Sequence, residues 1–149
     1  MKDYDLIIKQ MESLAEESAD PIPLMANVSA LLYHAMEDLN WAGFYLVKDE
    51  ALILGPFQGN VACVRIEKGK GVCGTAWKED RVQLVPNVHE FPGHIACDSA
   101  SNSEIVVPIH LNGEFFGVLD IDSPGFDRFN EKGKEGLVAL VKAMEKVMR

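Results

Sequence analysis

Two apolar runs joined by Asn112-Gly113 constrain the fold of this chain more than any other feature of its sequence. Both runs are rich in Val, Ile and Phe, and Asn-Gly between such runs predicts a β-hairpin, because both central residues of a type I′ turn need a positive φ. The second run closes with Asp120 and Asp122, which share one strand face because side chains alternate along a strand. Glu104 opens the partner strand. We therefore expect three carboxyl groups to meet at one end of the hairpin.

Helical and strand patterns alternate along the rest of the chain. Apolar residues recur at 3.6-residue spacing near both ends of the sequence, and a period of two begins at Trp41. Asp20-Pro21 is a helix-start signal, with Asp as the N-cap and Pro in the first turn. This order predicts an α+β domain, with a mostly antiparallel sheet of about six strands and helices covering both sides. The expected elements are helices over 3–18, 21–38, 75–81 and from about 130, and strands over 41–59 (two), 82–85 and on either side of Asn112-Gly113.

Length, composition and charge limit the classes of function. With 149 residues, 48% of them apolar and 25% charged, the chain is most simply one domain over residues 1–149. A net charge of −9 with scattered Lys and Arg argues against nucleic acid as a partner. No segment reaches the roughly 18 continuous apolar residues of a transmembrane helix, and the charged N-terminal residues lack a signal-peptide pattern. We therefore expect a cytoplasmic protein that binds no membrane.

Three cysteines, Cys63, Cys73 and Cys97, lie in segments that look irregular or at the edges of such segments. This placement favours exposed, reactive thiols, although inert free thiols stay open as the alternative. A metal site is not expected, because the cysteines are 10 and 24 residues apart and His89 and His94 bracket no cysteine pair. Thiol redox chemistry is the remaining interpretation. One cysteine can be oxidised to a sulfenic acid, and a second cysteine can react with that sulfenic acid to give a disulfide.

A thiol that attacks a sulfoxide sulfur also needs an acid to protonate the departing oxygen. Clustered carboxyl groups repel one another, which raises the pKa of at least one of them and keeps a proton available. Glu104, Asp120 and Asp122 could supply that proton or bind a substrate ammonium, and the alternative for them is a solvated strand end. Trp41 and Tyr45 share a strand face, where aromatic residues are usually part of the core.

Longer motifs connect these residues to a known family. The sequence resembles the free methionine-(R)-sulfoxide reductases, which are stand-alone GAF domains, over about residues 40 to 124. The three cysteines together with the motifs HIACD and LDIDS are specific, because GAF sensor domains are not expected to carry this set. The matching segments include NWAGFYL (40–46), GPFQG (55–59), GKGVCGTAW (69–77), FPGHIACDSASNSEIVVPI (91–109) and FGVLDIDSP (116–124).

The resemblance implies a reaction and a role for each thiol. Cys97 would attack the sulfoxide of free methionine-R-sulfoxide, releasing methionine and leaving a sulfenic acid. Cys63 would resolve it by forming a Cys63–Cys97 disulfide that thioredoxin reduces, so that the thiols carry the electrons and no cofactor is needed. Cys73 would be either a second resolving or relay thiol or a neighbour in the pocket.

The resemblance also implies the substrate contacts. Two aromatic residues match the wall that holds the methyl and thioether end of the substrate. Three acidic residues match those that bind the substrate and help to polarise or protonate its sulfoxide, and two backbone amides just before the nucleophile would bind the carboxylate. These residues are, in that order, Trp41 and Tyr45; Glu104, Asp120 and Asp122; Ile95 and Ala96.

Assembly and two rival functions complete the expectations. Members of the family tend to form homodimers, and the amphipathic helices near both ends of the chain offer an interface. The main rival function is a ligand-binding GAF sensor without catalysis, which usually belongs to a longer chain with an output domain. The second rival is a redox-sensing protein that uses the same cysteine pair as a switch.

Overall fold

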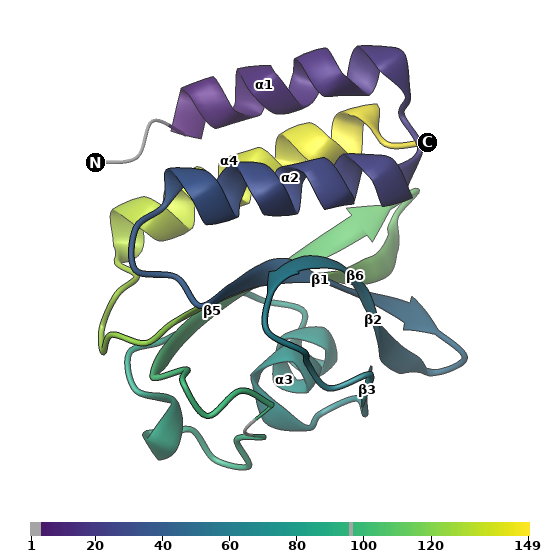
Figure 1. Cartoon of the computed structure of the whole chain (residues 1–149). Helices are drawn as coiled ribbons and strands as arrows, with labels where there is room; N and C mark the ends of the chain where they lie inside the picture. The colour runs from purple at the N-terminus through teal and green to yellow at the C-terminus, as the bar shows by residue number, and fades with distance from the viewer. Residues whose placement is uncertain (1–3, 96) are drawn as a thin grey trace.

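The computed structural model of the chain describes residues 4–95 and 97–149 (Figure 1). Its strands form one six-stranded sheet in the order β3-β2-β1-β6-β5-β4, and every neighbouring pair is antiparallel. This confirms the predicted α+β class and the predicted number of strands. The strands are β1 (Trp41–Lys48), β2 (Ala51–Gly59), β3 (Arg65–Ile66), β4 (Gln83–Val85), β5 (Ser103–Leu111) and β6 (Glu114–Ser123).

Helices cover both faces of the sheet, as predicted. Three of them stack on one face, and α3 lies alone against the other (Figure 1). Within the described ranges, no helix combines the length and the apolar character needed to cross a bilayer. The helices are α1 (Tyr4–Glu17), α2 (Pro21–Ala35), α3 (Gly71–Glu79) and α4 (Glu131–Val147), with a short 3₁₀ turn, η1 (Val88–Glu90).

Local sequence signals explain where several elements begin and turn. The carboxylate of Asp20 accepts a hydrogen bond from the backbone N–H of Ile22 at 3.0 Å, which caps α2 as predicted. The side chain of Asn130 caps α4 in the same way. Asn112 and Gly113 have φ values of 54° and 80°, so the β5–β6 hairpin turns through two left-handed residues.

Strand β1 separates two hydrophobic cores. Ala42 and Phe44 point towards α1, α2 and α4, whereas Trp41 and Tyr45 point towards α3, and all four are buried. The alternation predicted for this strand is therefore confirmed. The larger core lies under the three helices, and the smaller one, under α3, borders the polar groups described below.

Two local predictions are wrong. Helix α3 begins at Gly71 rather than Thr75, so Cys73 lies inside a helix and not in an irregular segment. A glycine is required at Gly74, because a Cβ there would collide with the carbonyl oxygen of Glu67, and the first turn packs closely for that reason. The segment before α3, residues 58–70, was also expected to be irregular throughout, yet it contains β3, which pairs with β2.

Candidate active site

A pocket opens on the face of the sheet that carries α3. It is lined by residues of β1, β5, β6 and α3 and of the loop that precedes β5. Its free space is about 40 Å³, enough for a few water molecules. The predicted site residues that line it are Trp41, Tyr45, Cys73, Ile95, Cys97, Glu104, Asp120 and Asp122.

The register of three strands brings the acidic residues together. Glu104 on β5 lies directly opposite Asp122 on β6, and Asp122 in turn pairs with Trp41 on β1. Asp120 lies two residues along β6 on the same face. Glu104 and Asp120 are 7% and 5% exposed, so the alternative of a solvated strand end is wrong. One carboxyl oxygen of Asp120 and one of Asp122 are buried without a hydrogen-bond partner among the described residues.

Burial and mutual repulsion keep protons on this cluster. Burial raises the pKa of Glu104 and of Asp122 well above the usual range, and the charge of Asp120 raises both further. Burial also raises the pKa of Asp120, but hydrogen bonds with Glu104 and Asp122 act in the opposite direction. Asp120 is therefore the carboxyl that ionises most readily, while Glu104 and Asp122 hold protons.

A disulfide joins Cys63 and Cys97, whose Cα atoms are 5.3 Å apart although 34 positions separate them in the sequence. Cys97 lines the pocket, whereas Cys63 lies outside its lining, on the segment between β2 and β3. Two thiols on separate loops are thus within bonding distance at the mouth of an acidic pocket. This arrangement can store and release two electrons.

Cys73 differs from the other two cysteines. It is a free thiol, 4% exposed, on the first turn of α3, so the expectation that all three thiols are exposed is wrong for this residue. Burial raises the pKa of the Cys73 thiol, and the neighbouring charges of Asp120 and Glu104 raise it further. A thiol held protonated in this way is a weak nucleophile.

Trp41 and Tyr45 form one wall of the pocket and also hold the loop that carries Cys63. Their rings stack with centroids 5.8 Å apart, and the Tyr45 hydroxyl donates a 2.8 Å hydrogen bond to the carbonyl oxygen of Cys63. The Trp41 indole N–H donates to the carbonyl oxygen of Asn60 at 3.1 Å. Because burial raises the pKa of Tyr45, its hydroxyl stays a donor. These residues are therefore both buried in the core and exposed to the pocket.

The segment before Cys97 is described in part. Ile95 lines the pocket, and its side chain packs against Gly71 at the start of α3. Its carbonyl oxygen accepts a 3.1 Å hydrogen bond from the N–H of Cys97. Ala96, also predicted as a substrate contact, lies outside the described residues.

A polar network that sequence reasoning missed fixes the loop after Cys97. The side-chain amide of Asn40 donates hydrogen bonds to Asp98 and Ser101, both at 3.0 Å, and its backbone N–H donates to the carbonyl oxygen of Asp122. Asp98 and Ser101 also line the pocket. The sequence signal was present, since Asn40 opens the matched segment NWAGFYL, but no short-range rule links it to a loop 58 residues away.

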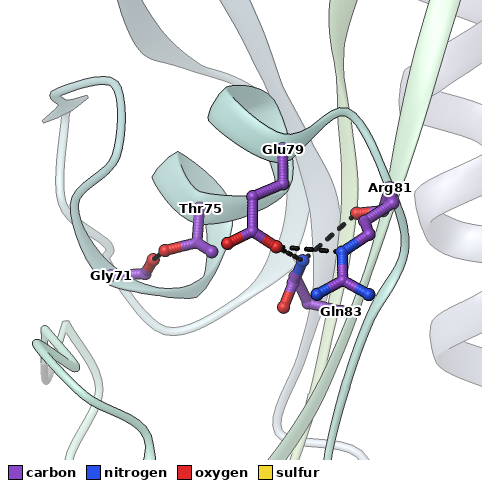
Figure 2. Close-up of polar contacts among 5 residues, drawn as sticks. All are labelled: Gly71, Thr75, Glu79, Arg81 and Gln83. Carbon is purple, nitrogen blue, oxygen red and sulfur yellow. Dashed lines mark hydrogen bonds and ion pairs between the residues drawn. The ribbon is translucent and has the colours of Figure 1, made fainter.

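The first turn of α3, including Lys70 and Gly71, is a second part of the site that was missed. Lys70 is the N-cap residue, and its side chain makes no capping hydrogen bond. Figure 2 shows how the helix is held: Thr75 donates to the Gly71 carbonyl at 2.6 Å, and Glu79 accepts from Arg81 and Gln83. These contacts anchor the far end of α3 next to β4, so its amino end is fixed at the pocket.

His94 is a further lining residue, which the sequence suggested only as a weak metal-ligand candidate. Burial lowers the pKa of His94, and nearby His89 lowers it further. In the described part of the chain, the residues whose ligand atoms could hold a metal ion are Cys73, Glu104 and Asp120, which lie within 4.8 Å of one another. Shared protons already account for this cluster, and the absence of a bound metal stays a prediction.

Comparisons with known proteins agree with this geometry. The model of the GAF domain family matches residues 20–145. The free methionine-R-sulfoxide reductase of Escherichia coli strain K12 is 57% identical over 124 residues, which cover 83% of this chain and 75% of that protein. Among solved structures, fRMsr of Staphylococcus aureus in complex with substrate has a TM-score of 0.94 and 52% identity, covering 100% of this chain and 97% of that one.

A second solved structure carries the full name of the family. The free methionine-R-sulfoxide reductase from Neisseria meningitidis, in complex with its substrate, is 43% identical, with a TM-score of 0.91 over 96% of this chain and 86% of that one. The matches span nearly the whole chain and include every described residue of the pocket. The chain therefore belongs to the GAF domain family and, within it, to the free methionine-R-sulfoxide reductases.

Proposed function

We propose that this protein reduces free L-methionine (R)-S-oxide to L-methionine, with Cys97 as the nucleophile. The observation that carries this proposal is the Cys63–Cys97 disulfide at the mouth of a pocket that is lined by three carboxyl groups, of which Glu104 and Asp120 belong to buried residues. A sulfoxide reductase needs two thiols within bonding distance and a nearby proton donor. Cys63 and Cys97 at the mouth of the pocket provide the thiols, and the carboxyl groups inside it provide the proton donor.

The reaction balances with these groups alone. The Cys97 sulfur attacks the sulfoxide sulfur, the sulfur–oxygen bond of the substrate breaks, and the oxygen and a proton end on Cys97 as a sulfenic acid while methionine leaves. The Cys63 thiol then attacks the sulfenic sulfur, which expels water and forms the disulfide. A dithiol reductant restores both thiols and takes the disulfide onto itself.

The carboxyl groups have different roles in this scheme. Glu104 and Asp122 hold protons and are the candidates that protonate the departing oxygen. Asp120 ionises most readily and is placed to bind the substrate ammonium. A buried anion is costly unless a cation pairs with it, so the site gains most from a ligand that carries a positive charge.

The rest of the substrate fits the remaining walls. The stacked rings of Trp41 and Tyr45 offer an apolar surface to the methyl and thioether groups. The backbone N–H groups of Ile95 and Ala96 are proposed donors to the carboxylate, and Lys70 adds a positive charge at the same pocket. A peptide has neither free terminus at an internal methionine, so this double recognition selects the free amino acid.

The decisive experiment measures methionine released from each epimer of free methionine sulfoxide, with dithiothreitol as the reductant. We expect turnover of the R epimer and little turnover of the S epimer. A folded, reduced protein that binds methionine sulfoxide but turns over neither epimer would instead be a sensor. A protein that forms the disulfide with peroxide but ignores both epimers would be a redox switch.

Recycling, location and assembly extend the proposal. Thioredoxin is the proposed reductant, and a thiol cycle of this kind operates in a reducing compartment such as the cytoplasm. A homodimer is proposed through the helical face, where Leu14 of α1 and Ile22 of α2 are exposed. Light scattering of the purified protein tests the dimer, because a mass of one chain contradicts it.

A further inference from the structure

Exposed apolar side chains surround the disulfide. Val61 is 86% exposed and Val64 is 70% exposed, and they lie two residues before and one residue after Cys63. Ile95, 41% exposed, lies two residues before Cys97. Large aliphatic side chains that gather in the open around one group mark an interaction site more often than isolated ones do.

The substrate pocket does not account for Val61 and Val64. Neither residue lines the pocket, although Ala62 between them and Ile95 opposite them do. The backbone of Val64 is held in place, since its carbonyl oxygen accepts a 3.1 Å hydrogen bond from the N–H of Leu54. A chain segment fixed by its backbone therefore presents two aliphatic side chains to solvent beside the disulfide.

The two cysteines of the disulfide have different surroundings. Cys97 is part of the pocket lining, whereas Cys63 lies outside it, on the segment that carries the two exposed valines. The Tyr45 hydroxyl donates a hydrogen bond to the Cys63 carbonyl oxygen and so holds this segment. A partner that contacts both valines therefore approaches the disulfide from the Cys63 segment.

We propose that Val61, Val64 and Ile95 form the docking surface for the dithiol protein that recycles the enzyme, and that its thiolate attacks the Cys63 sulfur. The disulfide bond then breaks with Cys97 as the leaving thiolate, and a mixed disulfide forms on Cys63. The second thiol of the partner attacks the partner's sulfur in that mixed disulfide, which releases Cys63 and leaves the partner oxidised. This inference rests on the proposed reductase cycle.

The chemistry of the surface favours a protein over glutathione. Glutathione is a small anion, and its recognition calls for free cations near the disulfide. Arg65 beside the surface pairs with Glu67 at 3.3 Å, and Lys68 lies over the Trp77 ring at 5.1 Å. Lys70 lines the substrate pocket, where the proposed cycle assigns it to the substrate carboxylate. The side chains nearest to Cys63 are aliphatic, and such a surface suits a partner that presents an apolar face around its own thiol.

The first test exchanges the two valines for acids. In the double variant Val61→Asp/Val64→Asp, we expect the KM for thioredoxin to rise about tenfold, since two carboxylates replace aliphatic side chains in the proposed contact; a tenfold rise corresponds to about 1.4 kcal/mol. Turnover with dithiothreitol should stay within about twofold of the parent protein. The matched control is Phe126→Asp in the turn after β6, an apolar side chain that is 59% exposed and does not line the pocket.

Two results would overturn this assignment. An unchanged KM for thioredoxin would show that the valines do not contact it, and faster recycling by glutathione than by thioredoxin would give the surface a different partner. Absence of turnover with dithiothreitol in the unsubstituted protein would count instead against the reductase function. The docking surface and the reductase function can therefore be contradicted separately.

The second test identifies the sulfur that is attacked. The disulfide form is mixed with a thioredoxin whose second active-site cysteine is replaced by serine, and free thiols are then blocked with iodoacetamide. Peptide mass spectrometry should find thioredoxin joined to Cys63 and the blocking group on Cys97. Thioredoxin joined to Cys97 would contradict the proposed direction of attack, even if the valine variants behave as expected.

Discussion

The two faces of the sheet bury different kinds of side chains. Under α1, α2 and α4 lies a core of packed aliphatic and aromatic side chains, among them the fully buried Leu119. On the other face, under α3, the next residue of the same strand is Asp120, buried among two further carboxyls and a thiol. One face stabilises the fold, and the other keeps ionisable groups out of water at a cost in stability. Buried ionisable groups of this kind are typical of functional sites.

The largest effect should come from substituting Cys97, the proposed nucleophile. Cys97→Ser should lower turnover by at least about a thousandfold, because a hydroxyl lacks the nucleophilicity of a thiolate and cannot form the disulfide. Thermal stability of the reduced protein should change little. Methionine release and a thermal melt of the same sample check both expectations. Substantial residual turnover would identify another nucleophile.

Adjacent residues of β6 offer the sharpest contrast between the faces. Leu119→Ala should cost about 3 kcal/mol of unfolding free energy, since it leaves a cavity in the larger core, while the folded protein keeps its kcat/KM. Asp120→Asn should lower kcat/KM about a hundredfold and leave the stability equal or higher. Urea unfolding and steady-state kinetics measure both quantities. Equal losses of stability in the two variants would remove the proposed difference between the faces.

The acidic face should also make stability depend on pH in an unusual direction. The pKa values of Glu104 and Asp122 are raised in the folded protein above those of the unfolded chain, near 4, so the folded state holds these protons more tightly. Their contribution to stability is complete below about pH 4 and is lost as the pH rises through the raised pKa values. Asp122→Asn cannot ionise, so its stability relative to the parent protein should increase with pH.

Urea unfolding of both proteins at several pH values between 5 and 9 tests this sign. The difference in unfolding free energy between Asp122→Asn and the parent protein is the quantity to follow, because it cancels the titration of groups that do not interact with Asp122. A difference that is constant with pH would mean that Asp122 does not titrate in this range. At neutral pH, Asp122→Asn should also lower turnover far more than Cys73→Ser does.

The sequence was sufficient to predict the features that depend only on neighbouring residues. The turn at Asn112-Gly113, the cap at Asp20 and the alternation along the strands all follow from neighbouring residues, and the hairpin register then brought Asp120 and Asp122 to the same end as Glu104. The resemblance to the reductases supplied the pairing of Cys63 with Cys97, which spacing alone left open.

The remaining features depend on tertiary contacts. Cys73 was expected to be exposed because its segment looked irregular, but Gly74 permits the close approach that buries the first turn of α3. The contact of Asn40 with Asp98 joins residues 58 positions apart, and no local pattern signals it. Lys70 was not predicted as a site residue, because no local pattern distinguishes it from other lysines until the pocket beside it is known.

Lys70 should have a moderate effect on the acidic face. Lys70→Ala should raise the KM for methionine-R-sulfoxide about fivefold, as expected for an exposed charge, with kcat nearly unchanged. Lys68→Ala is the matched control, because Lys68 stacks on Trp77 and does not line the pocket. With the amide of methionine-R-sulfoxide, which has no carboxylate, the Lys70 effect should vanish. An equal effect on both substrates would place Lys70 away from the carboxylate.

Cys73→Ser should have the smallest effect, less than about threefold on turnover. The thiol is buried beside Asp120, and burial keeps its pKa high, so it does not supply a thiolate at neutral pH. A serine hydroxyl fills nearly the same space and can make the same hydrogen bond to Asp120. The Cys63–Cys97 disulfide should still form after one turnover with methionine-R-sulfoxide, as mass spectrometry can show. A Cys73–Cys97 disulfide trapped early in the parent protein would instead make Cys73 a relay, and the reaction would then use three thiols rather than two.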